Sequence, residues 1–157
     1  MPIPETISRA LLDYAETRPE IIAVYIFGSY AAGQENANSD IDVALLLKND
    51  VPDLPHLMLR LDVEVCRALS SDRVDVLILN STPLSLRAEV VRTGRLIASW
   101  DDAARIDFEV QTMNRWWDFK PLLDEMDQIF FQRLKEKFTD DQRRTYQATR
   151  KAFARAR

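Results

Sequence analysis

Two continuous apolar segments constrain the fold of this chain more than any other feature of its sequence. They are Ile21–Phe27, which is followed directly by Gly28, and Ile41–Leu47, which is interrupted only by Asp42. Segments of this length are typical of strands and short for helices, and an apolar residue at nearly every position predicts burial on both faces of a sheet. Other elements of the chain must therefore cover both faces of that sheet.

Helices and further strands alternate with these two segments. Apolar periodicity predicts three amphipathic helices, at residues 7–15, 57–69 and 83–93. Two more strands are predicted at residues 73–79 and 95–99. The alternation favours an α/β fold in which helices flank a central sheet. From Asp101 to the end the apolar period is helical, and Pro121 is expected to kink this helix or to start a new one.

The length of the chain, 157 residues, suits one domain with one active site. All three glycines lie within the first 100 residues. We expect an α/β core over residues 1–100 and a helical C-terminal arm over residues 101–157 that packs on the core or on a partner. The arm ends in a segment, 142–157, with six basic and no acidic residues. This segment is either a solvated chain end or a contact site for RNA or for an acidic partner surface, and the sequence leaves both alternatives open.

The composition excludes several kinds of site. The single cysteine, Cys66, cannot form a disulfide within the chain, and together with the single histidine, His56, it cannot build a Cys/His zinc site. A formal net charge of −4 argues against a surface that attracts nucleic acid as a whole. The N-terminus lacks the pattern of a signal peptide, and no run reaches the roughly 20 apolar residues of a membrane span. We therefore expect a soluble, cytoplasmic protein.

A pair of acidic residues at the start of the second apolar segment predicts a metal site. Gly28 and Ser29 end the first segment, and after a gap of ten residues come Asp40 and Asp42. Residues two apart in a strand project from the same face, with Cα atoms about 6.5 to 7 Å apart. Two carboxylates that close repel each other unless a cation lies between them. Carboxylate oxygens suit Mg²⁺, which usually binds a few carboxylates together with substrate phosphates.

Three further residues extend this site. Asp75 interrupts the apolar segment at 73–79, and a charge in such a strand is costly to bury without a partner or a cation, so we expect it beside Asp40 and Asp42. A salt bridge with Arg73 or another basic group is the alternative. Gly28 permits a tight turn with a close approach to a ligand, and Ser29 adds a hydroxyl that suits phosphate oxygens, although a simple turn with a helix cap would use the same residues.

The segment FGSYAAGQENANSDIDVALLL resembles the Gly-Ser, ten-residue gap, Asp-x-Asp signature of the DNA polymerase β-like nucleotidyltransferase superfamily, and in particular its minimal, single-domain (MNT) branch. The resemblance implies a nucleotidyltransferase fold with a mixed four-stranded sheet flanked by helices. It also implies that Asp40, Asp42 and, on a later strand, Asp75 bind Mg²⁺, with two ions expected. Gly28 and Ser29 would contact the nucleoside triphosphate, with ATP as the substrate.

The stretches LRAEVVRTGRLIAS and DFEVQTMNRWWDFKPLLDEMDQ are similar to those of MntA-type antitoxins, which are paired with HEPN-type ribonuclease toxins. The resemblance implies transfer of AMP from ATP to a tyrosine of a HEPN toxin, which silences the toxin. Two alternatives stay open. One is a nucleotidyltransferase that acts on a small hydroxylated molecule, and the other is an antitoxin that covers its toxin without catalysis.

Several aromatic residues allow two interpretations. Trp116, Trp117 and Phe119 could anchor a partner or fill the core, and the sequence does not decide between these roles. Tyr25 and Tyr30 flank the Gly-Ser pair, and for Tyr30 a packing role is at least as plausible as a contact with the nucleotide. His56 is expected in a loop or at the start of a helix rather than in a catalytic role.

Overall fold

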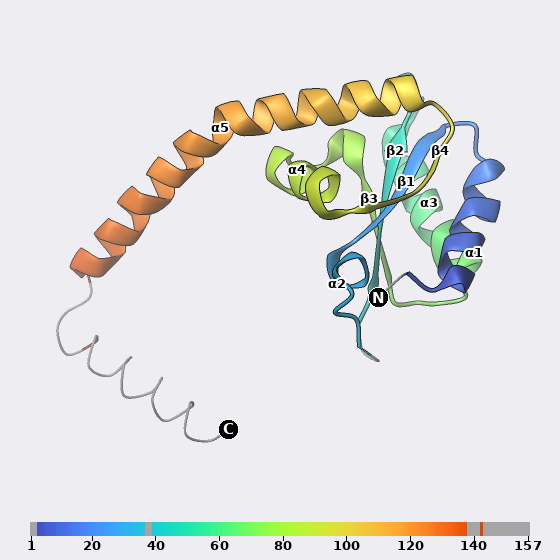
Figure 1. The fold of residues 1–157 in the computed structure, drawn as a ribbon, viewed down its shortest axis with the longest axis horizontal. Helices are drawn as coiled ribbons and strands as arrows, with labels where there is room; N and C mark the ends of the chain where they lie inside the picture. Colours follow the sequence, from blue (N-terminus) through green and yellow to red (C-terminus); the bar gives the residue numbers. More distant parts are fainter. Residues whose placement is uncertain (1–2, 37–38, 138–141, 143–157) are drawn as a thin grey trace. The chain divides into compact units, whose positions relative to one another are not determined.

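The computed structural model describes residues 3–36, 39–137 and 142, and it contains the predicted alternation of strands and helices (Figure 1). In chain order the elements are α1 (Glu5–Glu16), β1 (Ile21–Phe27), α2 (Gly28–Ala32), β2 (Ile41–Leu47), α3 (Leu54–Ala68), β3 (Val74–Ile78), a 3₁₀ turn (Leu79–Ser81), α4 (Leu84–Thr93), β4 (Arg95–Ser99) and α5 (Asp102–Lys137).

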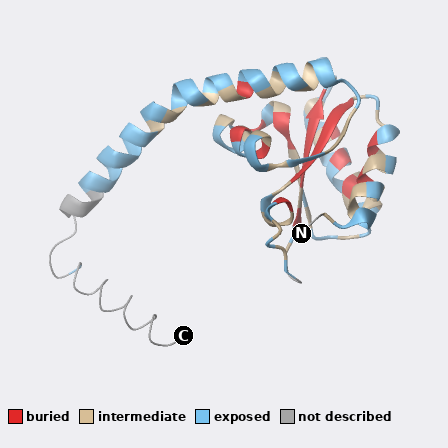
Figure 2. Cartoon of the chain, viewed as in Figure 1, coloured by how far each residue is buried: buried red, intermediate tan, exposed pale blue. Residues whose placement is uncertain are grey.

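The four strands form one mixed sheet in the order β3-β2-β1-β4. β1 is antiparallel to both of its neighbours, whereas β2 and β3 are parallel and are joined through α3. The predicted architecture, a mixed four-stranded sheet flanked by helices, is thereby confirmed. The two central strands are also the most deeply buried ones, as their continuous apolar sequences predict (Figure 2).

Two hydrophobic clusters lie on opposite faces of the sheet. On one face α1 and α3 pack through side chains such as Leu11, Leu61 and Val65, which have no exposed surface. The last two of these continue the four-residue apolar repeat of α3. On the other face α4 contributes Val90, and Ala104 and Phe108 from the start of α5 are partly buried against the same cluster. This second face matters for the site, because Ala44 and Leu46 of β2 point to it.

The edge strands are less buried than their apolar sequences suggest. β3 has one fully buried residue, Ile78, and Asp75 within it is exposed. Asp75 therefore lies within the strand without being buried in the interior. Since β3 is the last strand on its side of the sheet, water reaches the residues that would be enclosed in a central strand.

The chain divides into two compact units, Met1–Trp116 and Trp117–Arg157, so that α5 contributes to both. We call its first part, Asp102–Trp116, the root of α5. The helix continues through Pro121, so that of the two alternatives expected at this residue the start of a new helix is excluded. Proline removes one N–H donor and disturbs one turn, while the hydrogen bonds of the flanking turns maintain the helix.

Large apolar side chains are exposed in the second unit. Trp117 is 60 % exposed, and Phe119, Phe130 and Phe131 are exposed as well, so a role in the core of the described chain is excluded for these four residues. Trp116 is half-buried. The basic segment predicted at the C-terminus lies outside the described residues, apart from Gln142. In the part of the chain that the structure describes, no helix combines the length and the apolar character needed to cross a membrane.

Candidate active site

The Gly-Ser pair forms a tight turn at the end of β1. Gly28 follows Phe27 directly and starts the five-residue helix α2 with a φ of +63°, a left-handed conformation that favours glycine. Gly33 ends this helix at a φ of +67°, and the N–H of Gln34 donates to the carbonyl oxygen of Ser29 over 2.9 Å. The turn thus continues directly into a short helix.

This turn lies against the first acidic strand. Phe27 is opposite Asp42 in the antiparallel ladder of β1 and β2. The next residue, Gly28, comes so close that a Cβ atom built on it would collide with Oδ2 of Asp42 and lie 2.9 Å from Cγ. Glycine is required here for two independent reasons, the positive φ and the lack of space. The structure thus brings together two motif elements that ten residues separate in the sequence.

Asp75 lies beside Asp42 in the same sheet. The two residues are direct partners in the parallel ladder of β2 and β3, so their side chains emerge from one face. Alternation along each strand puts both on the face that carries Ala44 and Leu77, which is the face covered by α4 and the root of α5. Asp40 directly precedes β2, two residues before Asp42.

The electrostatics of Asp42 reflect these neighbours. Partial burial raises the pKa of its carboxyl group above the ordinary value, and the negative charges of Asp75 and Asp40 raise the pKa further. No salt bridge among the described residues joins these carboxylates to a basic side chain. The salt bridge considered for Asp75 is thus absent from the described part of the chain.

These carboxylates suit a cation without forming a complete cage for it. Among the residues that the structure describes, no group of three or more His, Cys, Asp or Glu side chains is arranged to hold a metal ion. Mg²⁺, however, usually binds one or two carboxylates and completes its octahedron with water and substrate phosphates. Asp42 and Asp75 fit this mode of binding, because they are neighbours without a salt bridge and Asp42 lies next to the glycine of the turn.

One neighbouring feature, a pair of hydrogen bonds between Asn36 and Ser39, was not identified from the sequence. The N–H of Asn36 donates to Oγ of Ser39, and the N–H of Ser39 donates to the carbonyl oxygen of Asn36, both over 2.9 Å. These two bonds join Asn36 to Ser39, the residue directly before Asp40. The Asn-x-x-Ser spacing is the signal that could have revealed it.

The remaining residues singled out from the sequence have other surroundings. Tyr30 packs against the hydrophobic cluster of α1 and α3, and Tyr25 is buried, with its hydroxyl donating to Glu109. His56 is exposed in the first turns of α3, 2.8 Å from Asp53, as expected for a residue at a helix start. None of these three residues is part of the carboxylate cluster.

Comparisons with known proteins agree with this geometry. The family model described as "Polymerase beta, Nucleotidyltransferase" matches residues 9–103. A curated relative, the protein adenylyltransferase MntA of Shewanella oneidensis, is 35 % identical over 77 residues, which are 49 % of this chain and 53 % of the relative. The chain thus spans about half the length of this relative.

Solved structures share the fold. A toxin–antitoxin structure with AMP-PNP superposes with a TM-score of 0.61 at 24 % identity, over 76 % of this chain and 97 % of the other. The MNT antitoxin structure in complex with a tri-AMPylated HEPN toxin of Shewanella oneidensis gives a TM-score of 0.56 at 22 % identity, over 76 % and 95 % of the two chains. At this level of identity the likeness establishes the fold alone.

Proposed function

Since this chain belongs to the polymerase β nucleotidyltransferase family, we propose that it is a Mg²⁺-dependent protein adenylyltransferase. In this proposal it transfers AMP from ATP to a tyrosine hydroxyl of a HEPN-type toxin and thereby acts as the antitoxin. The observation that carries the proposal is the position of Asp42, which lies against the Gly28 turn on one side and beside Asp75 on the other. A phosphate-binding turn and uncompensated carboxylates are the two parts that nucleotidyl transfer requires.

The partner and the acceptor are proposed from the relatives. The curated relative is named a protein adenylyltransferase, and structures of similar fold contain a toxin with its antitoxin, one with AMP-PNP and one with an AMPylated HEPN toxin. The exposed aromatic side chains of Trp117 and Phe130 are consistent with an acceptor that is itself a protein.

Each residue of the site has a role in this reaction. Asp40, Asp42 and Asp75 would hold two Mg²⁺ ions, which when bound neutralise the charge that develops on the attacking and leaving oxygens. Gly28 lets the triphosphate approach the backbone, and Ser29 offers its hydroxyl and N–H to the phosphate oxygens. Asp75, which is exposed on the edge strand, would orient the acceptor hydroxyl. The tyrosine hydroxyl would pass its proton to the carboxylate of Asp75 as its oxygen bonds to the α-phosphorus, and pyrophosphate leaves with the bridging oxygen.

Transfer of label from α-³²P-ATP to a HEPN-type toxin protein tests the proposal. We expect labelling in the presence of Mg²⁺ and loss of labelling when Asp40→Ala and Asp42→Ala are combined. Asp50→Ala is the matched control, because Asp50 is an exposed aspartate just beyond the opposite end of β2 and should leave transfer unchanged. Labelling by the double variant would refute the metal site. Inhibition of the toxin by that variant without labelling would instead identify an antitoxin that acts by binding alone.

A further inference from the structure

Arg73 lies at the same end of the sheet as the Gly28 turn, directly before β3. Its carbonyl oxygen accepts a hydrogen bond from the N–H of Ile41 over 3.0 Å, so its backbone continues the parallel ladder of β2 and β3. Since Ile41 pairs with the residue after it, Arg73 itself lies opposite Asp40. The ladder therefore places a basic residue at the border of the proposed metal site.

The side chain of Arg73 shares a face of the sheet with the carboxylates. Residues two apart in an extended chain project from the same face, so the side chain of Arg73 emerges on the same side as that of Asp75. This face also carries Asp42, because Asp42 and Asp75 are ladder partners. Arg73 and Asp75 are both exposed. A long cationic side chain is thus within reach of a ligand that binds over the carboxylates.

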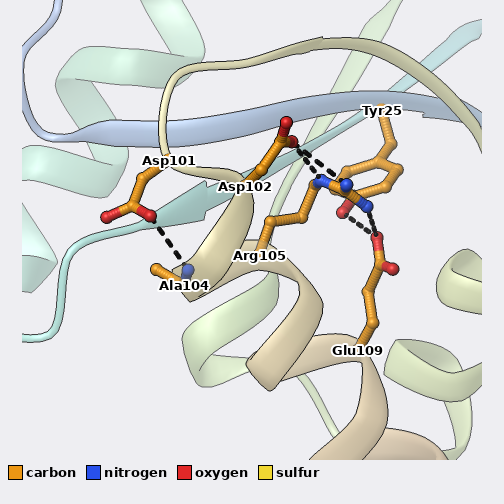
Figure 3. A network of polar contacts seen from close by, with 6 residues as sticks. All are labelled: Tyr25, Asp101, Asp102, Ala104, Arg105 and Glu109. Carbon is orange, nitrogen blue, oxygen red and sulfur yellow. Dashed lines mark hydrogen bonds and ion pairs between the residues drawn. The ribbon is translucent and has the colours of Figure 1, made fainter.

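Another arginine on this face of the sheet, Arg105, has different surroundings (Figure 3). Its Nη1 lies 2.9 Å from Oε1 of Glu109, and its Nη2 lies 3.1 Å from Asp102. The hydroxyl of Tyr25 donates to the same oxygen of Glu109 over 2.6 Å. Only 15 % of the Arg105 side chain is exposed. Arg105 therefore joins α5 to β1, whereas Arg73 differs from it in its exposure and in its position at the strand ends.

The proposed reaction determines where the α-phosphoryl group lies. In-line displacement requires the attacking and leaving oxygens on opposite sides of the phosphorus. Gly28 and Asp75 flank Asp42 from opposite sides, one at the end of β1 and the other in β3. With the triphosphate at the Gly28 turn and the acceptor hydroxyl at Asp75, the α-phosphorus lies over Asp42. Its non-bridging oxygens point across this line, and one direction open to them leads to the strand ends and Arg73.

The charges of the loaded site favour a further cation at this place. Three carboxylates and a triphosphate together carry more negative charge than two Mg²⁺ ions neutralise. A guanidinium presents a planar pair of donors that matches two phosphate oxygens, which an ammonium group does not. Donors that are positioned in advance stabilise the charge that develops in the transition state, and they therefore raise kcat more than they raise affinity for the substrate.

We propose that Arg73 is a further catalytic residue, whose guanidinium binds a non-bridging oxygen of the α-phosphate during AMP transfer. The inference rests on the proposed function, because it presupposes ATP in the site. The tyrosine oxygen bonds to the α-phosphorus and its proton passes to Asp75, while the bond from the phosphorus to the bridging oxygen breaks and pyrophosphate leaves. Arg73 exchanges no proton in this step. It orients the α-phosphoryl group and stabilises the charge on its oxygen.

The experiment compares Arg73→Gln and Arg73→Lys with Arg67→Gln. Arg67 is an exposed arginine in the last turn of α3, which covers the opposite face of the sheet, so Arg67→Gln is a control with the same change of charge. We expect Arg73→Gln to lower the kcat for AMP transfer to a HEPN-type toxin about 10²-fold, with the acceptor's KM and the unfolding temperature unchanged. Arg73→Lys keeps the charge without the planar fork and should restore part of the rate.

The two diastereomers of ATPαS test the contact itself, because sulfur replaces one non-bridging α-oxygen in each of them. Their Kd is measured by calorimetry without acceptor, and their kcat in the transfer reaction. In the unaltered chain we expect the isomer with sulfur facing Arg73 to bind and react about tenfold more weakly than ATP. This penalty should vanish in Arg73→Gln, which has already lost the contact. A penalty that arises from Mg²⁺ at the other oxygen should persist in the variant.

The outcomes separate this contact from a structural role and from the proposed function. Equal isomer penalties in Arg73→Gln and the unaltered chain, an equal loss of rate in Arg67→Gln, or a lower unfolding temperature alongside the lost rate would overturn the inference. A higher acceptor KM with unchanged kcat would also overturn it, because Arg73 would then contact the acceptor. If the unaltered chain transfers no AMP, the adenylyltransferase proposal fails, and the Kd values of the isomers still decide the role of Arg73. If it binds neither isomer, both are refuted.

Discussion

Two acidic clusters of this molecule have opposite surroundings. Glu64, between α1 and α3, receives a hydrogen bond from Tyr14 and pairs with Arg18. Asp42, at the end of the sheet, is flanked by Asp75 and Asp40 and by a glycine turn. Both carboxylates are partly buried, so burial alone does not distinguish them. Glu64 has its counter-charge within the fold, whereas Asp42 lies among like charges, and in the proposed function a bound cation would compensate them.

The largest effect on the surroundings of Asp42 is expected when the space beside its carboxylate is filled. We expect Gly28→Ala to lower the rate of AMP transfer by about 10²-fold, because the new Cβ displaces the carboxylate from its position. Gly33→Ala is the control, since Gly33 has a similar φ of +67° and imposes comparable backbone strain at the other end of α2. Equal losses of rate in the two variants would mean that strain, and not the contact with Asp42, limits activity.

Mg²⁺ should remove the repulsion in one cluster and leave the other unaffected. At a concentration about ten times its Kd, Mg²⁺ is expected to raise the unfolding temperature of the unaltered chain by about 3 °C. Asp42→Asn should abolish this increase, while Tyr14→Phe should retain it. Calorimetric or fluorescence melting with and without EDTA measures the effect. An increase that persists in Asp42→Asn would place the cation elsewhere.

A smaller effect should follow from pH. The pKa of Asp42 is raised in the folded chain, so the folded state binds this proton more readily than the unfolded state does, and its contribution to stability is lost as pH rises through the folded-state pKa. Without metal, Asp42→Asn should therefore unfold about 1 to 2 °C above the unaltered chain at pH 7. This difference should vanish below the ordinary aspartate pKa, about 4. A difference that grows on acidification would contradict the assigned direction.

The sequence predicts those parts of the fold that depend on local pattern. β1 and β2 coincide with their apolar segments, because a strand that is buried on both faces has apolar residues at nearly every position. The turn at Gly28 and Ser29 was recognised from the residue types that such a turn requires. The proximity of this turn to Asp42 also followed, but only through the spacing of a family motif.

Features that depend on long-range pairing were not predicted. Nothing local to Asp75 shows that its strand lies at the edge, because edge position is a property of strand order. Tyr25 and Glu109 are 84 residues apart, and periodicity carries no information about such a pair. The sequence pattern also does not predict the exposure of Trp117 and Phe130, since a helix has the same apolar periodicity whether or not another surface covers it.

The edge position of β3 has a consequence for the choice of acceptor under the proposed function. Asp75, exposed on the outermost strand, is open to a folded protein, which need not insert a flexible segment into a deep cleft. Discrimination among targets then depends on how well two surfaces dock, and not on the shape of an enclosing cavity. New target preferences should accordingly arise through substitutions on the outer helices, with the central strands left untouched.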